Sequence, residues 1–156
     1  MILDERTEFL DATALNTGAA GTYLIGDVID LGVANASQPY GGEGDSDAAW
    51  LVIGVDTAVT SAGAATVQFA LASDAQAAIA TDGTATQHFL SAAIPKATLV
   101  AGYQAVAIRL PRGSYERYLG ILQVTGVAAL TAGKVNAFLT RNVPTPLKVY
   151  DAPASA

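Results

Sequence analysis

The stretch RYLGILQVTGVAALTAGKVNAFLTR, residues 117–141, decides the fold class of this chain. Its first half, YLGILQVT, is largely apolar on both faces of an extended chain. Its second half, KVNAFLT, alternates apolar and polar residues with the period of two of a half-buried strand. Only Phe138 is apolar on the polar side of this second segment. Gly126 and Gly133 bound the connection, and glycine can adopt the positive φ of a turn, so the stretch predicts a β-hairpin with a wide loop.

Five further segments have strand patterns with turn signals between them. They cover residues 23–32, 50–59, 65–72, 86–94 and 99–111. The second and third flank a short loop with Gly63, which predicts another hairpin. Residues 73–83 predict a loop decoration with at most one helical turn, because Ala, Gln and Ile follow a capping Ser or Asp. About eight short strands predict an all-β antiparallel jelly roll or β-sandwich, with a closed barrel as the competing architecture.

The length predicts one domain over residues 1–156, large enough to bury roughly 70% of the surface that the unfolded chain exposes. Residues 1–15 lack a clean period and predict an N-terminal arm with a short strand. This arm contains large apolar residues, Phe9 and Leu10 among them. We expect them to be covered by the chain's own sheet edge or, alternatively, by a neighbouring subunit.

Residues 142–156 contain three prolines. The fixed φ and missing N–H of proline make a helix unfavourable, so this segment predicts an extended C-terminal arm on the surface. Leu147 and Tyr150 are large side chains that could dock it.

Composition excludes several classes of function. The chain has no cysteine, which removes disulfides, Cys-ligated zinc, iron–sulfur clusters and thiol nucleophiles together. A net charge of −6 is unfavourable for nucleic-acid binding, which rests on clustered Lys and Arg. No apolar run reaches the length of a membrane helix, and acids follow Met1 where a secretory signal would be cationic and then apolar. We therefore expect a soluble protein made and used without Sec export, with neither nucleic acid nor a membrane as a partner.

The charge is divided unevenly along the sequence. Residues 1–95 contain twelve acids and one base, a balance of −11, whereas residues 96–156 contain seven bases and two acids, a balance of +5. One interpretation is that strands of the two halves interleave and mix the charges over the surface. The other is a cationic docking face, since arginine pairs well with carboxylates of a partner. The arginines that would form such a face are Arg109, Arg112, Arg117 and Arg141.

Catalytic and metal-binding patterns are weak. The single histidine, His88, lies within a predicted strand, where a structural role is far more common than catalysis. Glu43, Asp45 and Asp47 alternate in a Gly-rich loop, but the Gly and the closing Glu of an EF-hand are missing. We expect a solvated acidic loop at 42–47, with a bound cation as the lesser alternative. We expect no catalytic residue, no metal and no cofactor.

A binding role has better support in the sequence. Tyrosines at strand ends or in loops can serve as a sugar platform, as a protein interface or as a shield for the ends of a sandwich. Phe138 is a candidate for contact with a second layer or a second subunit. The interface candidates are Phe9, Leu10, Tyr40, Arg109, Arg112, Tyr115, Arg117, Phe138, Arg141, Leu147 and Tyr150.

Several segments together resemble a known family. They are MILDERTEFLDATAL (1–15), VIDLG (28–32), AAWLVIGVDTAVTSAGAATVQFAL (48–71) and RYLGILQVTGVAALTAGKVNAFLT (117–140). In these segments the chain resembles the Bbp16-type capsid cement proteins of tailed bacteriophages. The resemblance implies a jelly-roll protein that is made in the host cytoplasm and lies on the outer surface of the virion. There it would bind the major capsid protein of an HK97-like shell as a homo-oligomer, a dimer in preference to a trimer.

Two functions follow as expectations. The first is a structural capsid cement or decoration protein, not an enzyme, that stabilises joints between capsid subunits. The alternative is a jelly-roll glycan-binding module, which the tyrosines and the acidic loop motivate. Neither the loop at 42–47 nor the proline-containing arm matches a segment of the family resemblance, so no contact is implied there.

Overall fold

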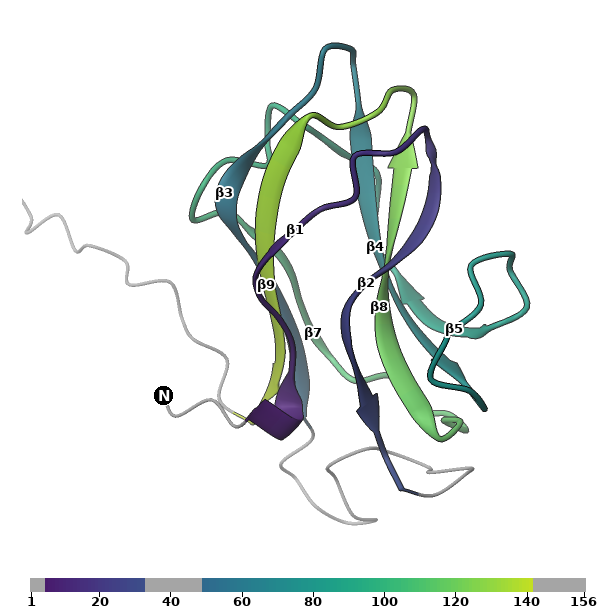
Figure 1. Ribbon diagram of the computed structural model, residues 1–156. Coiled ribbons are helices and arrows are strands. Elements are labelled where there is room, and N and C mark those ends of the chain that lie inside the picture. Colours follow the sequence, from purple (N-terminus) through teal and green to yellow (C-terminus); the bar gives the residue numbers. More distant parts are fainter. Residues whose placement is uncertain (1–4, 33–48, 142–156) are drawn as a thin grey trace, which may run out of the picture.

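The computed structural model describes residues 5–32 and 49–141, which fold as a sandwich of two antiparallel β-sheets (Figure 1). A short 3-10 turn, η1 (Glu5–Thr7), precedes the first strand. The strands are β1 (Glu8–Ala14), β2 (Gly21–Asp30), β3 (Trp50–Thr60), β4 (Thr66–Asp74), β5 (Thr86–Leu90), β6 (Ile94–Pro95), β7 (Gln104–Arg109), β8 (Tyr118–Gly126) and β9 (Ala132–Thr140).

The strand order is that of a jelly roll. One sheet has the order β1-β9-β3-β7, and the other has the order β2-β8-β4-β5 with β6 beside β4. The first strand pairs with the last, β2 pairs with β8, β3 with β7 and β4 with β5. The chain is thus a long antiparallel ribbon folded over itself, as in the double Greek key of a jelly roll. The predicted all-β jelly roll is confirmed, and the competing closed barrel is wrong.

The two predicted hairpins are wrong, although their strands are confirmed. β8 and β9 lie in opposite sheets, and so do β3 and β4, so each connection crosses between sheets instead of joining neighbours. The connection from β1 to β2 crosses in the same way. Each crossing has an apolar residue buried between the sheets, Leu15, Ala65 or Leu130, which a hairpin loop would leave outside. All three crossings lie at one end of the sandwich (Figure 1), which we call the arch end. It comprises residues 15–20, 61–65 and 127–131.

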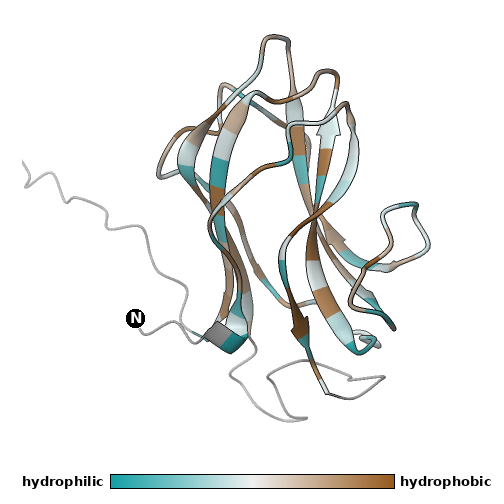
Figure 2. Cartoon of the chain, viewed as in Figure 1, coloured by the Kyte–Doolittle hydropathy of each residue, from teal (hydrophilic) through white to brown (hydrophobic). Residues whose placement is uncertain are grey.

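The main core fills the space between the two sheets. Its largest side chains come from alternate positions of the strands, for example Phe69 and Leu71 of β4 and Ile53 of β3, which have no exposed surface. The hydropathy of the strands alternates accordingly (Figure 2). Burying one such side chain stabilises the fold by about 1.5–3 kcal/mol.

The N-terminal segment belongs to this core. Phe9 and Leu10 are each 1% exposed, so the expectation that the chain's own sheet covers them is confirmed. The short strand predicted within this arm is confirmed as β1, which pairs with β9. Two consecutive side chains can both face inward because the register shifts between Glu8 and Leu10, as in a β-bulge.

A second, smaller cluster lies on the outer face of the β2-β8-β4-β5 sheet. Ile79, in the connection from β4 to β5, is 3% exposed and packs over Gly120, where an added Cβ would lie 2.6 Å from the Ile79 Cδ1 atom. The Asp74 carboxylate accepts two backbone N–H hydrogen bonds from this connection and holds it closed. Residues 75–83 therefore form the predicted loop without a helical turn, while Ser73 and Asp74 belong to β4.

Candidate protein-binding surface

The arginines singled out from the sequence lie at the end of the sandwich opposite the arch end. Trp50, at the start of β3, pairs with Arg109 at the end of β7 and with Thr140 at the end of β9. Arg141 follows Thr140 directly. Arg117 precedes β8, which runs from this end to the crossing at 127–131. We call this the arginine end, and it carries Arg109, Arg112, Arg117 and Arg141.

Arg117 is paired within the chain. Its Nε and Nη2 atoms each donate a hydrogen bond of 2.9 Å to a carboxylate oxygen of Asp30, at the end of β2. These bonds, together with the backbone N–H of Gly32, hold the pKa of Asp30 below its ordinary value, and the pKa of Arg117 is raised in return. The guanidinium also lies 5.2 Å from the centre of the Tyr118 ring. Because the pair is nearly half exposed, it adds little to stability and chiefly fixes Arg117.

Three more arginines lie at this end, which also carries the acids Glu8, Asp74 and Glu116. Arg109, Arg112 and Arg141 are exposed, and the latter two have no ion-pair partner among the residues that the structure describes. Glu116 is partly buried and accepts a 2.7 Å hydrogen bond from the Thr86 hydroxyl. Exposed guanidinium groups fit carboxylates on a protein partner. The structure thus places three exposed arginines at one end, and their role as a docking face stays a prediction.

Tyr115 is a core residue, which corrects its assignment as an interface candidate. It has no exposed surface, and its Oη atom donates a 2.5 Å hydrogen bond to the carbonyl of Pro111. Its ring stacks on His88 with the ring centres 3.9 Å apart and the planes 18° from parallel. Burial raises the pKa of the phenol to about 12. Phe9 and Leu10 are likewise buried within the chain, so they are not on its surface.

His88 has the structural role expected of a lone strand histidine. Its Nε2 atom lies 2.7 Å from the hydroxyl of Ser73, which has no exposed surface and also accepts the Glu116 backbone N–H at 3.1 Å. Burial lowers the pKa of His88, and the nearby Glu116 charge opposes this shift. The serine therefore faces the fold rather than a cleft. Together with Tyr115, this network anchors the connection that carries Arg112 and Arg117 to β4 and β5.

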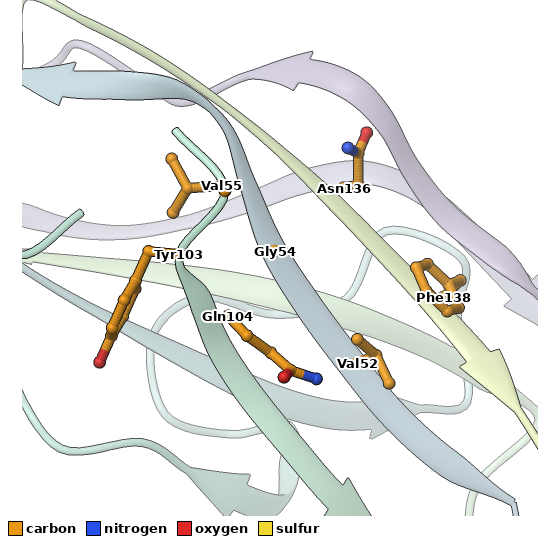
Figure 3. Close-up of a pocket in the computed structure, with 8 residues that line it drawn as sticks. Val52, Gly54, Val55, Tyr103, Gln104, Asn136 and Phe138 are labelled. Atoms are coloured by element: carbon orange, nitrogen blue, oxygen red, sulfur yellow. The ribbon is translucent and has the colours of Figure 1, made fainter. Parts of the chain in front are cut away.

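Phe138 lies on the outer face of the other sheet, in a shallow hollow. It pairs with Val52 of β3 and with Glu8 of β1, and it is only 8% exposed. The hollow measures about 240 Å³ (Figure 3), and its lining is Val52, Gly54, Val55, Gly102, Tyr103, Gln104, Asn136 and Phe138. Phe138 is therefore buried outside the main core, on the face turned away from the second sheet, so the suggested contact with a second layer is wrong and its contact with a second subunit stays a prediction.

The hollow exists because of a residue that sequence reasoning passed over. Gly54 stands in the middle of β3, and a Cβ added there would meet no atom within 4 Å. Glycine inside a strand often marks a place where another group approaches the backbone, which is the signal that could have revealed it. The Asn136 Oδ1 atom accepts a hydrogen bond from the backbone N–H of Ala12, which fixes this side chain at the edge of the hollow.

Three interface candidates, Tyr40, Leu147 and Tyr150, lie outside the described residues, and so does the acidic loop at 42–47. Within residues 5–32 and 49–141, no three His, Cys, Asp or Glu side chains are grouped closely enough to hold a metal ion. The same part of the chain has no helix long and apolar enough to cross a membrane.

Fold and surface together define an all-β jelly-roll protein whose candidate docking site is the end with the exposed arginines. The chain belongs to the Bbp16 family, because the model of that family matches residues 9–139. The match runs from the first residues of β1 to the end of β9 and thus covers the whole sandwich. Among curated proteins, none matches the chain.

Proposed function

We propose that this chain is a capsid cement protein that decorates the outer surface of a tailed-phage capsid and stabilises joints between major capsid protein subunits. Membership of the Bbp16 family over residues 9–139 is the observation that carries the proposal. The role is structural, and it needs a stable fold with a docking surface rather than a catalytic centre. The jelly roll and its arginine end meet both needs.

The arginine end is the surface proposed to face the capsid. Several element ends meet there: η1 begins and β2 and β9 finish at this end, and β3 starts from it. Their positions follow from hydrogen bonds, since the Leu31 N–H donates to the Arg117 carbonyl and the Leu110 N–H donates to the Ala49 carbonyl. An oligomer that grips two capsid subunits through such ends gains affinity by multivalency.

Binding of the purified chain to capsids that lack it tests the proposal. The triple variant Arg109→Glu, Arg112→Glu and Arg141→Glu should bind roughly tenfold more weakly, because three exposed ion pairs are lost and each contributes about 0.2–1 kcal/mol. Lys134→Glu, a single charge reversal at an exposed position of β9 nearer the arch end, should bind as wild type does. Equal binding by all three proteins would exclude the arginine end as the docking face.

Capsid stability tests the cement role itself. Capsids without the protein should break at a lower temperature than decorated ones. They should also break sooner when the salt concentration is lowered. Equal resistance to heat and to low salt would contradict the role. Deleting residues 142–156 should leave a folded domain, because β9 ends at Thr140, but should weaken attachment. An insoluble truncated chain would instead assign the tail to the core or to an oligomer interface.

The glycan-binding alternative has lost part of its support. Tyr115, one of its two proposed platforms, is buried in the core. The other, Tyr40, lies outside the described residues. Glycan-array binding by the isolated chain that is lost on Tyr40→Ala would favour this alternative over cement.

A further inference from the structure

His88 of β5 links β4 to the connection between β7 and β8, which we call the 110–117 connection. The His88 Nε2 atom lies 2.7 Å from the Ser73 hydroxyl oxygen, and the ring stacks on Tyr115 with the ring centres 3.9 Å apart. The Ser73 oxygen also accepts the Glu116 backbone N–H at 3.1 Å. One buried hydroxyl thus joins β4, β5 and the 110–117 connection.

The hydrogen bonds around Ser73 determine which nitrogen of the His88 ring carries the proton. A backbone N–H can only donate, so the Ser73 oxygen accepts from Glu116. Ser73 has no exposed surface, and in the described part of the chain His88 Nε2 is the other partner of its side chain. A buried hydroxyl needs an acceptor for its own proton. Neutral His88 therefore accepts at Nε2 and carries its proton on Nδ1.

A second proton does not fit this arrangement. The imidazolium is a donor at both nitrogens, so the Ser73 hydroxyl would lose its acceptor while it stays buried. An unsatisfied buried hydroxyl costs about 1–3 kcal/mol. Burial of the ring lowers the pKa of His88, and a hydrogen bond accepted by the neutral ring acts in the same direction.

The groups that face the ring leave its protonation to the pH. Glu116 is the one described residue whose charge acts on His88, and this charge raises the pKa of the ring against the larger effect of burial. On β4 the partner is the neutral Ser73, and the adjacent Asp74 carboxylate accepts two backbone N–H groups of the following loop. Tyr115 stays neutral, because burial raises its pKa to about 12.

We propose that His88 is a pH-sensitive latch on the 110–117 connection, closed while its ring is neutral and opened when the ring takes up a proton. In the closed state the ring accepts from Ser73 and supports the Tyr115 ring. On opening, the charged ring leaves the serine for water and the Glu116 carboxylate, and the stack on Tyr115 is lost. The 110–117 connection thereby loses its aromatic contact with β5.

Opening of the latch is local. Backbone hydrogen bonds fix both ends of the 110–117 connection, from the Leu110 N–H to the Ala49 carbonyl and from the Leu31 N–H to the Arg117 carbonyl. Neither bond involves the histidine, so both persist when the latch opens. The residues between these two bonds, the exposed Arg112 among them, then gain mobility while the sandwich stays folded.

The latch is a property of the isolated chain and does not rest on the proposed capsid role. It has a consequence for that role, because Arg112 and Arg117 both belong to the 110–117 connection. Binding through the arginine end should weaken as the pH falls, since the closed conformation is then less populated.

NMR of the imidazole nitrogens tests the closed state. His88 is the single histidine, so in the full chain without a histidine tag its two nitrogen signals are identified directly. At pH 7 the ring should be neutral with its proton on Nδ1. Ser73→Ala removes the donor to Nε2 and should raise the pKa of His88 toward its ordinary value. A proton on Nε2 at pH 7, or a Ser73→Ala ring that titrates as in wild type, would overturn the proposal.

Hydrogen exchange of the backbone amides tests the opening. The comparison amide is that of Leu15, which donates to the Gly133 carbonyl at the arch end. After correction for the intrinsic effect of pH on exchange, the Glu116 amide should lose protection relative to Leu15, by up to about tenfold for each pH unit below 6.5. His88→Gln keeps an acceptor for Ser73 but does not titrate, so this loss should disappear. Unchanged relative protection of Glu116 between pH 7 and 5, or an equal loss in His88→Gln, would show that there is no latch.

Discussion

Truncation of Tyr115 should cost the fold about 4–6 kcal/mol. The side chain has no exposed surface, and shortening a buried aromatic residue to alanine costs about 3–5 kcal/mol. Loss of the hydrogen bond to the Pro111 carbonyl adds about 1 kcal/mol. Domains of this size are stable by about 5–15 kcal/mol, so Tyr115→Ala should lower the Tm by roughly 10–20 °C and leave a marginal fold.

A milder variant separates packing from hydrogen bonding. Tyr115→Phe keeps the stack on His88 and should cost only about 1 kcal/mol. Tyr23→Phe is the matched control, because the Tyr23 Oη atom donates a 2.6 Å bond to the Ala19 carbonyl at an exposed site, where water can replace it. Urea unfolding followed by the fluorescence of Trp50, the single tryptophan, measures all three variants. A Tyr115→Ala protein within about 1 kcal/mol of wild type would refute the assignment of Tyr115 to the core.

Three further changes test other parts of the structure. Burial lowers the pKa of His88 below 6.5, so the unfolded chain binds a proton at a higher pH than the folded chain does. The free energy of unfolding should therefore be full above pH 6.5 and should fall as the pH drops below it. His88→Gln should reduce this pH dependence, measured by urea unfolding from pH 7 to 5. Gly26→Ala should destabilise by more than about 1 kcal/mol, since its φ is 68° and the new Cβ would lie within 2.3 Å of the Phe9 carbonyl; a neutral change in Tm would contradict the geometry. Phe138→Ser should cost about 3 kcal/mol or dissociate the oligomer, and a variant with unchanged stability and sedimentation would contradict both interpretations of this residue.

Strand positions were predictable from the sequence because apolar residues at every second position mark the side of a strand that is buried. The segment with Val67, Phe69 and Leu71 has this pattern, and all three side chains are fully buried in β4. Pairing was not predictable, because a short connection between two apolar strands fits a hairpin as well as a crossing between sheets about 10 Å apart. The distinguishing feature is Leu130 or Ala65 buried inside the connection, and burial of one loop residue leaves no periodic signal.

The candidate site was predictable only in part. Charge alone singled out Arg109, Arg112 and Arg141, and the topology then gathered their strand ends. Tyr115 was misassigned because a tyrosine in a loop has the same sequence signature whether its ring points outward or, as here, stacks on a histidine 27 positions earlier. The positive φ of Val127 was not predictable either, because the expected turn residue was the adjacent Gly126.

The connection from β7 to β8 combines a core residue with an exposed cation. It crosses between the sheets, and Tyr115 fills the core beneath it, while Arg112 stays exposed. The contacts proposed for the arginine end are charged, so capsid binding should weaken as added salt screens them. Measuring binding at low and high ionic strength tests this expectation. Binding that does not change with salt would show that apolar contacts, and not the exposed arginines, hold the chain on the capsid.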